Sequence, residues 1–351
     1  MTGMTNGKGS KHMRQNGETR LGARPRRVFV CEYLSAAGTA PGEAAAALLE
    51  QGCAMRDALV ADLLGVPGVN VAVAHGGPPA PPVPRGAVAV VAPHGAALFD
   101  FVHRQAPAHD LAWIVAPESD GLLARLHHGV AAKGARRGIG CDADSIGIAS
   151  SKRATLERLA RHGVATPLAF DAAGARHWVV KPDDGAGATD TRRHASRDAA
   201  RADLQRRRAA GMAATLEPWV EGEALSLSLL CGGGGTAQLL AANRQQIGLD
   251  AEGQIAFRGV EVGALRHDRP RLAALRALAG ALARALPGLA GYVGVDLVWH
   301  AARGPVAIEI NPRLTCAYVG LSAALGRNVA HAVIAAHEAR FAPVEASDAR
   351  A

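Results

Sequence analysis

Three oxygen-bearing side chains in the last quarter of the chain alternate with apolar residues. Asp296 lies in the stretch GVDLVW, and Glu309 and Asn311 lie in the stretch AIEINPR, which follows a short turn. Because side chains of a strand repeat every two residues, Glu309 and Asn311 share one face of a predicted hairpin. Oxygen ligands from neighbouring strands suit Mg²⁺, with phosphate oxygens completing its shell. Solvent-facing polar residues are the alternative, but they do not explain why Ile308 and Ile310 flank the acid.

Three basic residues stand where they could hold an anion. Arg313 follows the predicted metal ligands and could grip a phosphate or a carboxylate with two N–H groups. Lysine is scarce, with five lysines among 39 basic residues, which suggests that the remaining ones serve as compact ammonium groups. Lys181 ends the apolar stretch WVVK, and Lys152 follows two serines at the head of a predicted helix. A cation at a helix N-terminus is unfavourable unless an anion compensates, and a triphosphate would be that anion.

Two segments between these residues favour contacts with a nucleotide. Gly185 and Gly187 follow Lys181 and would let backbone N–H groups approach an anion, although an ordinary glycine turn is the alternative. The surrounding sequence does not match the Walker phosphate-binding pattern. The stretch LEPWVEGE, residues 216–223, could pair its backbone with an adenine edge and its carboxylates with ribose hydroxyls. Taken alone, this stretch is better described as an exposed edge strand.

Strands and helices alternate over the first part of the chain, which indicates an open α/β layer. Helical spacing of apolar residues predicts a helix at 43–64, and another is expected to begin near residue 99. The expected strands of this part are apolar runs at 28–33, 69–74, 87–92 and 111–116.

Strands dominate after residue 177, which indicates a mixed α+β region. Helices are expected at 153–162, 271–286 and 328–341. The expected strands are 177–181, 215–220, 225–231, 237–244, 292–299 and 306–310. Four consecutive glycines, residues 232–235, are expected at a hairpin tip rather than in a phosphate loop, because no helix follows them.

Composition excludes several classes of protein. No apolar run approaches the roughly 18 residues of a membrane span, and the polar start of the chain does not resemble a secretory signal. Of the net charge of +8, +6 lies in the first 27 residues, which are expected to form a disordered tail. With only 4% aromatic residues, nucleic-acid binding is a weak alternative. Five scattered cysteines argue against disulfides or a cysteine zinc site and suit a reducing cytoplasm.

The order of these motifs over residues 28 to 335 resembles the ATP-grasp superfamily of ADP-forming ligases. The resemblance implies an α+β protein with the ATP-grasp fold and an N-terminal α/β (pre-ATP-grasp) domain. It implies ATP and Mg²⁺ or Mn²⁺ as ligands and small-molecule substrates, an acid and an amine, which react through an acyl phosphate. The implied domains are a tail at 1–27, the α/β domain at 28–145, a small lobe at 146–215, a large lobe at 216–342 and a tail at 343–351.

The same resemblance assigns roles to individual residues. The implied ATP-binding residues are Lys152 and Lys181 at the phosphates, Gly185 and Gly187 in a closing loop, Glu217, Trp219 and Val220 at the adenine, and one of Glu221 and Glu223 at the ribose. The choice between the two acids stays open, because the family often carries its acid one residue further on, where this chain has Ala224. The implied metal ligands are Asp296, Glu309 and Asn311, and the implied catalytic residues are Arg313 and Lys181.

Three segments resemble a narrower group, the archaeal tyramine–glutamate ligases of methanofuran synthesis and their bacterial relatives. They are the opening FVCEY at 29–33, the segment VAPESD at 115–120 and the short Ser-Ser-Lys entry at 150–152. This resemblance implies that the γ-carboxylate of L-glutamate is joined to tyramine or tyrosine. The alternatives are a ligase with another acid–amine pair, a bicarbonate-using carboxylase and a non-catalytic ATP-binding module. The sequence leaves the oligomeric state open, a homodimer included.

Overall fold

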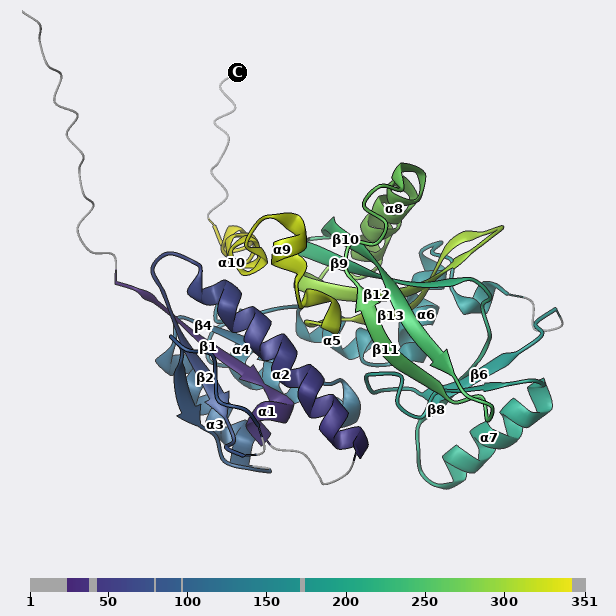
Figure 1. The fold of residues 1–351 in the computed structure, drawn as a ribbon, viewed down its shortest axis with the longest axis horizontal. Helices are drawn as coiled ribbons and strands as arrows, with labels where there is room; N and C mark the ends of the chain where they lie inside the picture. Colours follow the sequence, from purple (N-terminus) through teal and green to yellow (C-terminus); the bar gives the residue numbers. More distant parts are fainter. Residues whose placement is uncertain (1–23, 38–42, 79, 96, 171–173, 343–351) are drawn as a thin grey trace, which may run out of the picture.

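The computed structural model describes residues 24–37, 43–78, 80–95, 97–170 and 174–342. Figure 1 shows an N-terminal domain on one side, a small lobe on the other, and a large lobe that joins them. Within the described residues, no helix is long and apolar enough to cross a membrane. Most of the expected basic tail, residues 1–23, and the tail at 343–351 lie outside the described residues.

The N-terminal domain is a parallel sheet of five strands in the order β3-β2-β1-β4-β5. Its strands are β1 (Arg26–Glu32), β2 (Val69–His75), β3 (Val88–Val91), β4 (Leu111–Val115) and β5 (Gly138–Ile139). Helix α2 (Glu43–Leu64) covers one face, and α3 (Ala97–Ala108) and α4 (Leu122–Ala131) cover the other. Because both faces are covered, the inner strands are apolar throughout rather than alternating.

Both ends of the first predicted strand needed correction. The strand begins at Arg26, two residues before its expected start at residue 28, because Arg26 and Arg27 pair with β2. It ends at Glu32, and Tyr33 opens the short helix α1 (Tyr33–Ala37) instead of extending the strand. The carboxylate of Glu32 accepts hydrogen bonds from the backbone N–H groups of Leu34 and Ser35, at 3.0 and 2.7 Å, which satisfies donors at the start of that helix.

The small lobe is an antiparallel sheet in the order β7-β6-β8, packed against one helix. Its elements are β6 (Trp178–Pro182), β7 (Arg192–His194), α7 (Arg197–Ala209) and β8 (Ala214–Pro218). Its core is small, with four buried apolar residues: Trp178, Val180, Ala200 and Ala214. Two helices, α5 (Ala143–Ala149) and α6 (Lys152–Arg161), and a 3₁₀ turn, η2 (Pro167–Ala169), connect this lobe to the N-terminal domain.

The large lobe is an antiparallel sheet in the order β11-β10-β9-β12-β13. Its strands are β9 (Glu223–Gly233), β10 (Thr236–Leu249), β11 (Ile255–Glu261), β12 (Ala290–His300) and β13 (Gly304–Asn311). Its helices are α8 (Arg269–Ala285), α9 (Leu321–Leu325) and α10 (Val329–Ala339). The four-glycine hairpin tip between β9 and β10 and the predicted β12–β13 hairpin are confirmed, whereas β11 was not expected.

The units are less separate than the expected boundaries suggest. The boundaries at 145/146 and 215/216 fall inside α5 and β8, elements that cannot be divided between two cores. One apolar cluster combines Val30 of β1 and Leu59 of α2 with Tyr292 of β12 and Val333 of α10. The N-terminal domain and the large lobe therefore share a core, while the small lobe has its own.

The small lobe is also tied to the large lobe through backbone hydrogen bonds. The N–H of Arg193 donates to the carbonyl of Gly253 at 2.7 Å, and the N–H of Ile255 donates to the carbonyl of Thr191 at 2.8 Å. Gly253 has a φ of +82°, and a Cβ added there would lie 2.2 Å from the Arg193 carbonyl oxygen. Only glycine fits at this contact.

We predict that Gly253→Ala will lower stability by more than left-handed strain alone, because it also disrupts the contact between the two lobes. The matched control is Gly163→Ala, which has a φ of +73° but open space around its Cβ. Both variants should lose about 1–2 kcal/mol through left-handed strain. Chemical unfolding would measure this, and an equal loss of stability in the two variants would contradict the prediction.

Candidate active site

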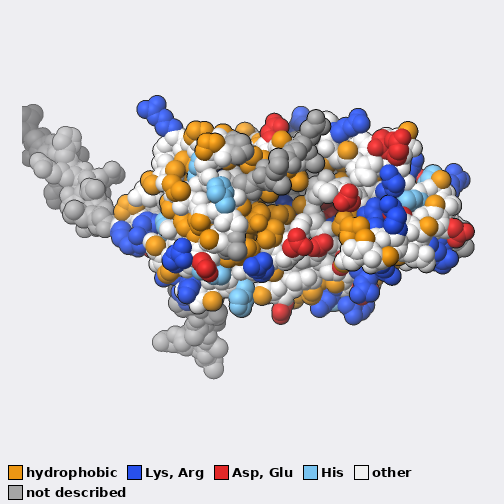
Figure 2. All heavy atoms as spheres, turned by 90° about the horizontal axis from the view of Figure 1, so that it is seen from below, with side chains coloured by type: hydrophobic (Ala, Val, Ile, Leu, Met, Phe, Trp, Pro, Cys, Tyr) orange, Lys and Arg blue, Asp and Glu red, His pale blue; other side chains and the backbone are white. Residues whose placement is uncertain are grey.

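A cleft of about 1510 Å³ is lined by residues from the N-terminal domain and from both lobes. The N-terminal domain contributes the carboxyl ends of β1 and β4, which lie side by side because Glu32 pairs in register with Val115. Parallel sheets generally bind ligands at this edge. Figure 2 shows the molecule from one face, with Lys and Arg side chains gathered at the end that holds the small lobe.

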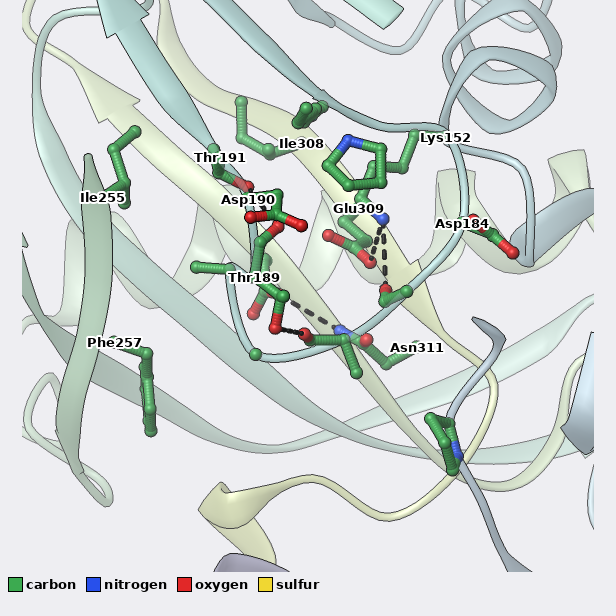
Figure 3. A pocket seen from close by; sticks show the side chains of 18 of the residues that line it. Lys152, Asp184, Thr189, Asp190, Thr191, Ile255, Phe257, Ile308, Glu309 and Asn311 are labelled. Atoms are coloured by element: carbon green, nitrogen blue, oxygen red, sulfur yellow. Dashed lines mark hydrogen bonds and ion pairs between the residues drawn. The ribbon is translucent and has the colours of Figure 1, made fainter. Parts of the chain in front are cut away.

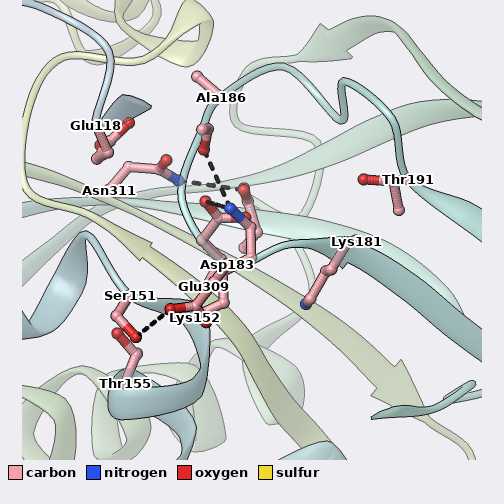
Figure 4. A network of polar contacts seen from close by, with 12 residues as sticks. Glu118, Ser151, Lys152, Thr155, Lys181, Asp183, Ala186, Thr191, Glu309 and Asn311 are labelled. Carbon is pink, nitrogen blue, oxygen red and sulfur yellow. Dashed lines mark hydrogen bonds and ion pairs between the residues drawn. The ribbon is translucent and has the colours of Figure 1, made fainter. Parts of the chain in front are cut away.

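Lys152 is the first residue of α6, whose N-cap is Ser151. The Lys152 Nζ atom lies 3.3 Å from an Oε1 of Glu309 and donates to the carbonyl oxygen of Gly185 at 3.1 Å. Figures 3 and 4 show this ammonium group between Glu309 and the loop that carries Gly185. The structure thus brings together a predicted phosphate ligand and a predicted metal ligand on α6 and β13.

The negative charge of Asp183 lies at the N-terminus of α6, where it offsets the positive charge of Lys152. Its carboxylate accepts hydrogen bonds from the Arg153 N–H at 2.9 Å and from the Ser151 hydroxyl at 2.7 Å. Its backbone carbonyl accepts from the Lys152 N–H at 2.8 Å. The sequence analysis expected a triphosphate to supply this negative charge, whereas the protein supplies a carboxylate of its own. A carboxylate at a helix N-terminus is favourable for the same reason that a phosphate is.

Lys181 is buried against Glu217 across the antiparallel pair β6–β8. The Lys181 Nζ lies 3.0 Å from Glu217 Oε2, and the hydroxyl of Thr215 donates to Glu217 Oε1 at 3.1 Å. Both charged side chains are at most 6% exposed, and both residues line the cleft. Lys181 contacts one oxygen of the Glu217 carboxylate, and Thr215 contacts the other. The carboxylate is therefore fully used within the small lobe, where it fixes the position of the Lys181 ammonium group.

The predicted adenine segment lines the cleft through Glu217, Trp219 and Val220. The backbone N–H of Trp219 donates to the carbonyl of His177 at 2.9 Å, so this group is used within the small lobe. The buried indole Nε1 of Trp219 has no hydrogen-bond partner in the described part of the chain. An unpartnered buried donor is unusual in a folded protein.

Neither predicted ribose acid is placed in the cleft. Gly222 and Ala224 line it, and Glu221 and Glu223 do not. Glu223 accepts hydrogen bonds from Arg244 and Arg271, both at 2.7 Å. Burial acts to raise the pKa of Glu223, but the hydrogen bonds from the two guanidinium groups lower it below its ordinary value. The expectation that one of these acids holds a ribose has no support in this arrangement.

The three predicted metal ligands converge at the β12–β13 hairpin. Asp296 pairs in register with Glu309, and Asn311 lies two residues further along β13. Asp296 accepts from Gln245 Nε2 at 2.8 Å and from Asn311 Nδ2 at 3.1 Å, which leaves the amide oxygen of Asn311 for another partner. Burial and the nearby charge of Glu309 raise the pKa of Asp296 to about 7.

This donor set fits a divalent cation. Two partly buried carboxylates repel each other across the hairpin, and Lys152 is the one Lys or Arg within 4.0 Å of either carboxylate among the described residues. Two carboxylates and an amide offer hard oxygen atoms, which Mg²⁺ and Mn²⁺ prefer. The described ranges contain no group of three or more His, Cys, Asp or Glu residues that could hold a metal, so this candidate set is two carboxylates and one amide.

Arg313 is held by a partner from the N-terminal domain. Its Nε and Nη2 atoms donate to the two carboxylate oxygens of Glu118 at 3.0 and 2.8 Å. Burial acts to lower the pKa of Arg313, but Glu118 raises it above its ordinary value, so the guanidinium keeps its charge. The sequence analysis singled out the segment containing Glu118 but not its partner, because the two residues are 195 positions apart.

The predicted glycine loop, residues 183–191, crosses from the small lobe toward the N-terminal domain. Gly185 and Gly187 have φ values of +107° and +72°, and Ala188 and Asp190 also adopt positive φ. The loop reaches the N-terminal domain at Asp184, whose carboxylate accepts from the backbone N–H of Asp120 at 2.8 Å. Figure 3 shows Asp190 and its neighbours on the part of the loop that passes over β13.

Two family models match the chain in sequence. One is described as an ATP-grasp domain and covers residues 149–317, and the other is described as a pre ATP-grasp 3 domain and covers residues 77–146. No curated protein gives a significant match.

Solved structures with a similar fold include a putative ATP-grasp superfamily protein from Archaeoglobus fulgidus. It is 23% identical, with a TM-score of 0.66 and coverage of 88% of each chain. D-alanine–D-alanine ligase from Bacillus anthracis is 15% identical, with a TM-score of 0.62 over 90% of this chain and 99% of that one. L-amino acid ligase from Bacillus licheniformis is 14% identical, with a TM-score of 0.60 over 91% of this chain and 75% of that one.

The matched ranges agree with the units seen in the structure, because the first model covers both lobes around the cleft and the second covers much of the N-terminal sheet. The chain therefore carries an ATP-grasp domain preceded by a pre-ATP-grasp domain, and its fold is the ATP-grasp fold.

Proposed function

We propose that this protein is an ATP-dependent carboxylate–amine ligase that forms ADP and acts through an acyl phosphate. One observation carries the proposal: a single cleft holds two buried lysines, Lys152 and Lys181, beside the oxygen donors of the β12–β13 hairpin. Such a cleft suits a polyphosphate with its metal ion. The structural neighbours named as D-alanine–D-alanine ligase and L-amino acid ligase are consistent with this class of reaction.

Different residues of the cleft would have different roles in phosphoryl transfer. Lys152 and Lys181 would hold the phosphates as point charges, and Asp296, Glu309 and Asn311 would hold Mg²⁺ or Mn²⁺. When bound, the metal ion neutralises charge on the phosphoryl group during transfer. The glycine loop lies over β13, where it would shield an acyl phosphate from water. Arg313 would steady the oxyanion that forms when the amine attacks.

We propose L-glutamate as the acid, activated at its γ-carboxylate, and tyramine or tyrosine as the amine. The segments that resemble the tyramine–glutamate ligases support this pair. Glu32 ends β1, Asp120 follows β4, and both line the same cleft. The segments that carry the resemblance therefore lie at the edge of the sheet where substrates other than the nucleotide would bind.

The charges on this side of the cleft favour tyramine over tyrosine. Carboxylates of Glu32, Asp120 and Asp184 line it, together with the apolar side chains of Leu34, Leu48, Met55 and Val115. Arg313 is the one Lys or Arg among the lining residues outside α6 and the small lobe, and Glu118 occupies part of its guanidinium. An amine with an apolar body and no carboxylate is the better complement to these groups.

We predict that ADP release will require L-glutamate together with tyramine, with tyrosine as a slower amine. A coupled assay for ADP, run over amino acids crossed with amines, would measure this, and mass spectrometry would identify the γ-glutamyl amide. If both pairs fail while another acid–amine pair turns over, the ligase proposal stands and the substrate proposal falls. Bicarbonate-dependent ADP release would indicate a carboxylase, and ATP binding without any turnover would indicate a binding module.

We predict that Lys152→Ala and Lys181→Ala will each lower the kcat/KM for ATP by about 10²-fold or more, because each removes a cation from the phosphates. Lys133→Ala is the matched control, since Lys133 is exposed and does not line the cleft. Steady-state kinetics would measure the effect. Turnover near that of the wild type in either cleft variant would refute the assignment.

We predict that Glu309→Ala and Asn311→Ala will abolish turnover and leave the fold intact, because each removes a metal ligand. The exposed Glu252 provides a control variant, Glu252→Ala. Binding of Mn²⁺ followed by electron paramagnetic resonance would report the site without relying on activity, and circular dichroism would report the fold. Turnover in the absence of Mg²⁺ and Mn²⁺ would rule out this site.

A further inference from the structure

We infer that Glu118 is a positioning residue that orients Arg313 for the reaction, so that the N-terminal domain helps to set the geometry of the reacting centre. The inference rests on the proposed function, since it assumes that Arg313 faces the reacting atoms. Glu118 itself does not line the cleft, whereas Arg313 and both chain neighbours of Glu118, Pro117 and Ser119, do. Glu118 therefore lies behind the arginine and would act through it.

The geometry fixes the plane of the guanidinium group. Glu118 takes the Nε and Nη2 edge of Arg313 with both carboxylate oxygens, and Nη1 donates to the carbonyl of Leu314 at 3.0 Å. Two planar groups joined by two parallel hydrogen bonds have one relative orientation. With the third bond to Leu314, the side chain has no remaining rotation about its terminal bonds.

Three of the five N–H hydrogens of Arg313 are used in this way. The two that remain are one on each terminal nitrogen, and they are available to a ligand in the cleft. A carboxylate or phosphoryl oxygen could therefore bind Arg313 while the contact with Glu118 stays intact. Without Glu118, a flexible arginine would have to become ordered at the moment of reaction, which lowers the rate more than it lowers nucleotide binding.

The pair also spans two units of the structure. Glu118 follows β4 of the N-terminal domain, and Arg313 follows β13 of the large lobe; Figure 4 shows Glu118 near the end of β13 that carries Asn311. The side chains are 3% and 8% exposed, so water does not screen the pair. A shift of the N-terminal domain would displace Arg313 relative to the predicted metal ligands Glu309 and Asn311, which lie four and two residues earlier, at the end of β13.

The test is a double-mutant cycle on Glu118→Gln and Arg313→Lys, with kcat and KM measured for ATP and for the amine. Glu118→Gln keeps the shape of the side chain and should lower kcat about tenfold or more, with the KM for ATP within about twofold. In the Arg313→Lys background, Glu118→Gln should change kcat little, because a lysine has no planar guanidinium group for Glu118 to orient.

Asp62→Asn is the matched control. Asp62, on α2, accepts a hydrogen bond of 2.7 Å from the hydroxyl of Tyr318, a contact between the same two units that does not involve Arg313. This variant should lower the melting temperature and leave kcat unchanged. A similar loss of kcat in Asp62→Asn, or additive effects in the cycle, would show that Glu118 has a structural role only and would overturn the inference.

A second readout does not depend on turnover. In the ¹⁵N NMR spectrum, the Nε–H resonance of Arg313, identified by its loss in Arg313→Lys, should exchange slowly with water in the wild type and rapidly in Glu118→Gln. An unchanged exchange rate would overturn the inference. If no acid–amine pair releases ADP in the wild type, the proposed function fails, and this measurement still decides whether Glu118 orders the arginine.

Discussion

The cleft depends on one electrostatic constraint, namely that three of its buried cations are each matched by a carboxylate from another element. Lys152 of α6 meets Glu309 of β13, Lys181 of β6 meets Glu217 of β8, and Arg313 meets Glu118 from beyond β4. An isolated buried charge costs several kcal/mol, so these groups can be held out of water only as pairs. The pairing keeps the cations in position before any ligand arrives, which is the meaning of preorganisation in such a site.

The metal ligands are the exception to this balance. Lys152 pairs with Glu309 but not with Asp296, and burial together with the charge of Glu309 raises the pKa of Asp296. The surplus of negative charge is placed where a divalent cation would remove it. The cleft therefore has a surplus of negative charge at the hairpin and is neutral at the ion pairs Lys181–Glu217 and Arg313–Glu118.

Sequence reasoning predicted the candidate site residues that a pattern within a short stretch of the chain indicates. Glu309 and Asn311 were found because a strand repeats every two residues, and Lys181 because it ends an apolar run. Residues that meet only in the folded protein show no such pattern. Glu118, the partner of Arg313, is an example, because the two residues are 195 positions apart. That Glu221 or Glu223 holds a ribose stays an untested prediction; neither residue lines the cleft, although their neighbours Gly222 and Ala224 do.

The division of the apolar core has a consequence for the order in which parts of the molecule unfold. The N-terminal domain and the large lobe share one cluster, sealed where α10 packs beside α2, whereas the small lobe relies on four buried residues of its own. The first two units should unfold together as one cooperative block, while the small lobe should behave as a separate, weaker foldon. Amide protons of β6 and β8 should therefore exchange through an opening of lower free energy than global unfolding.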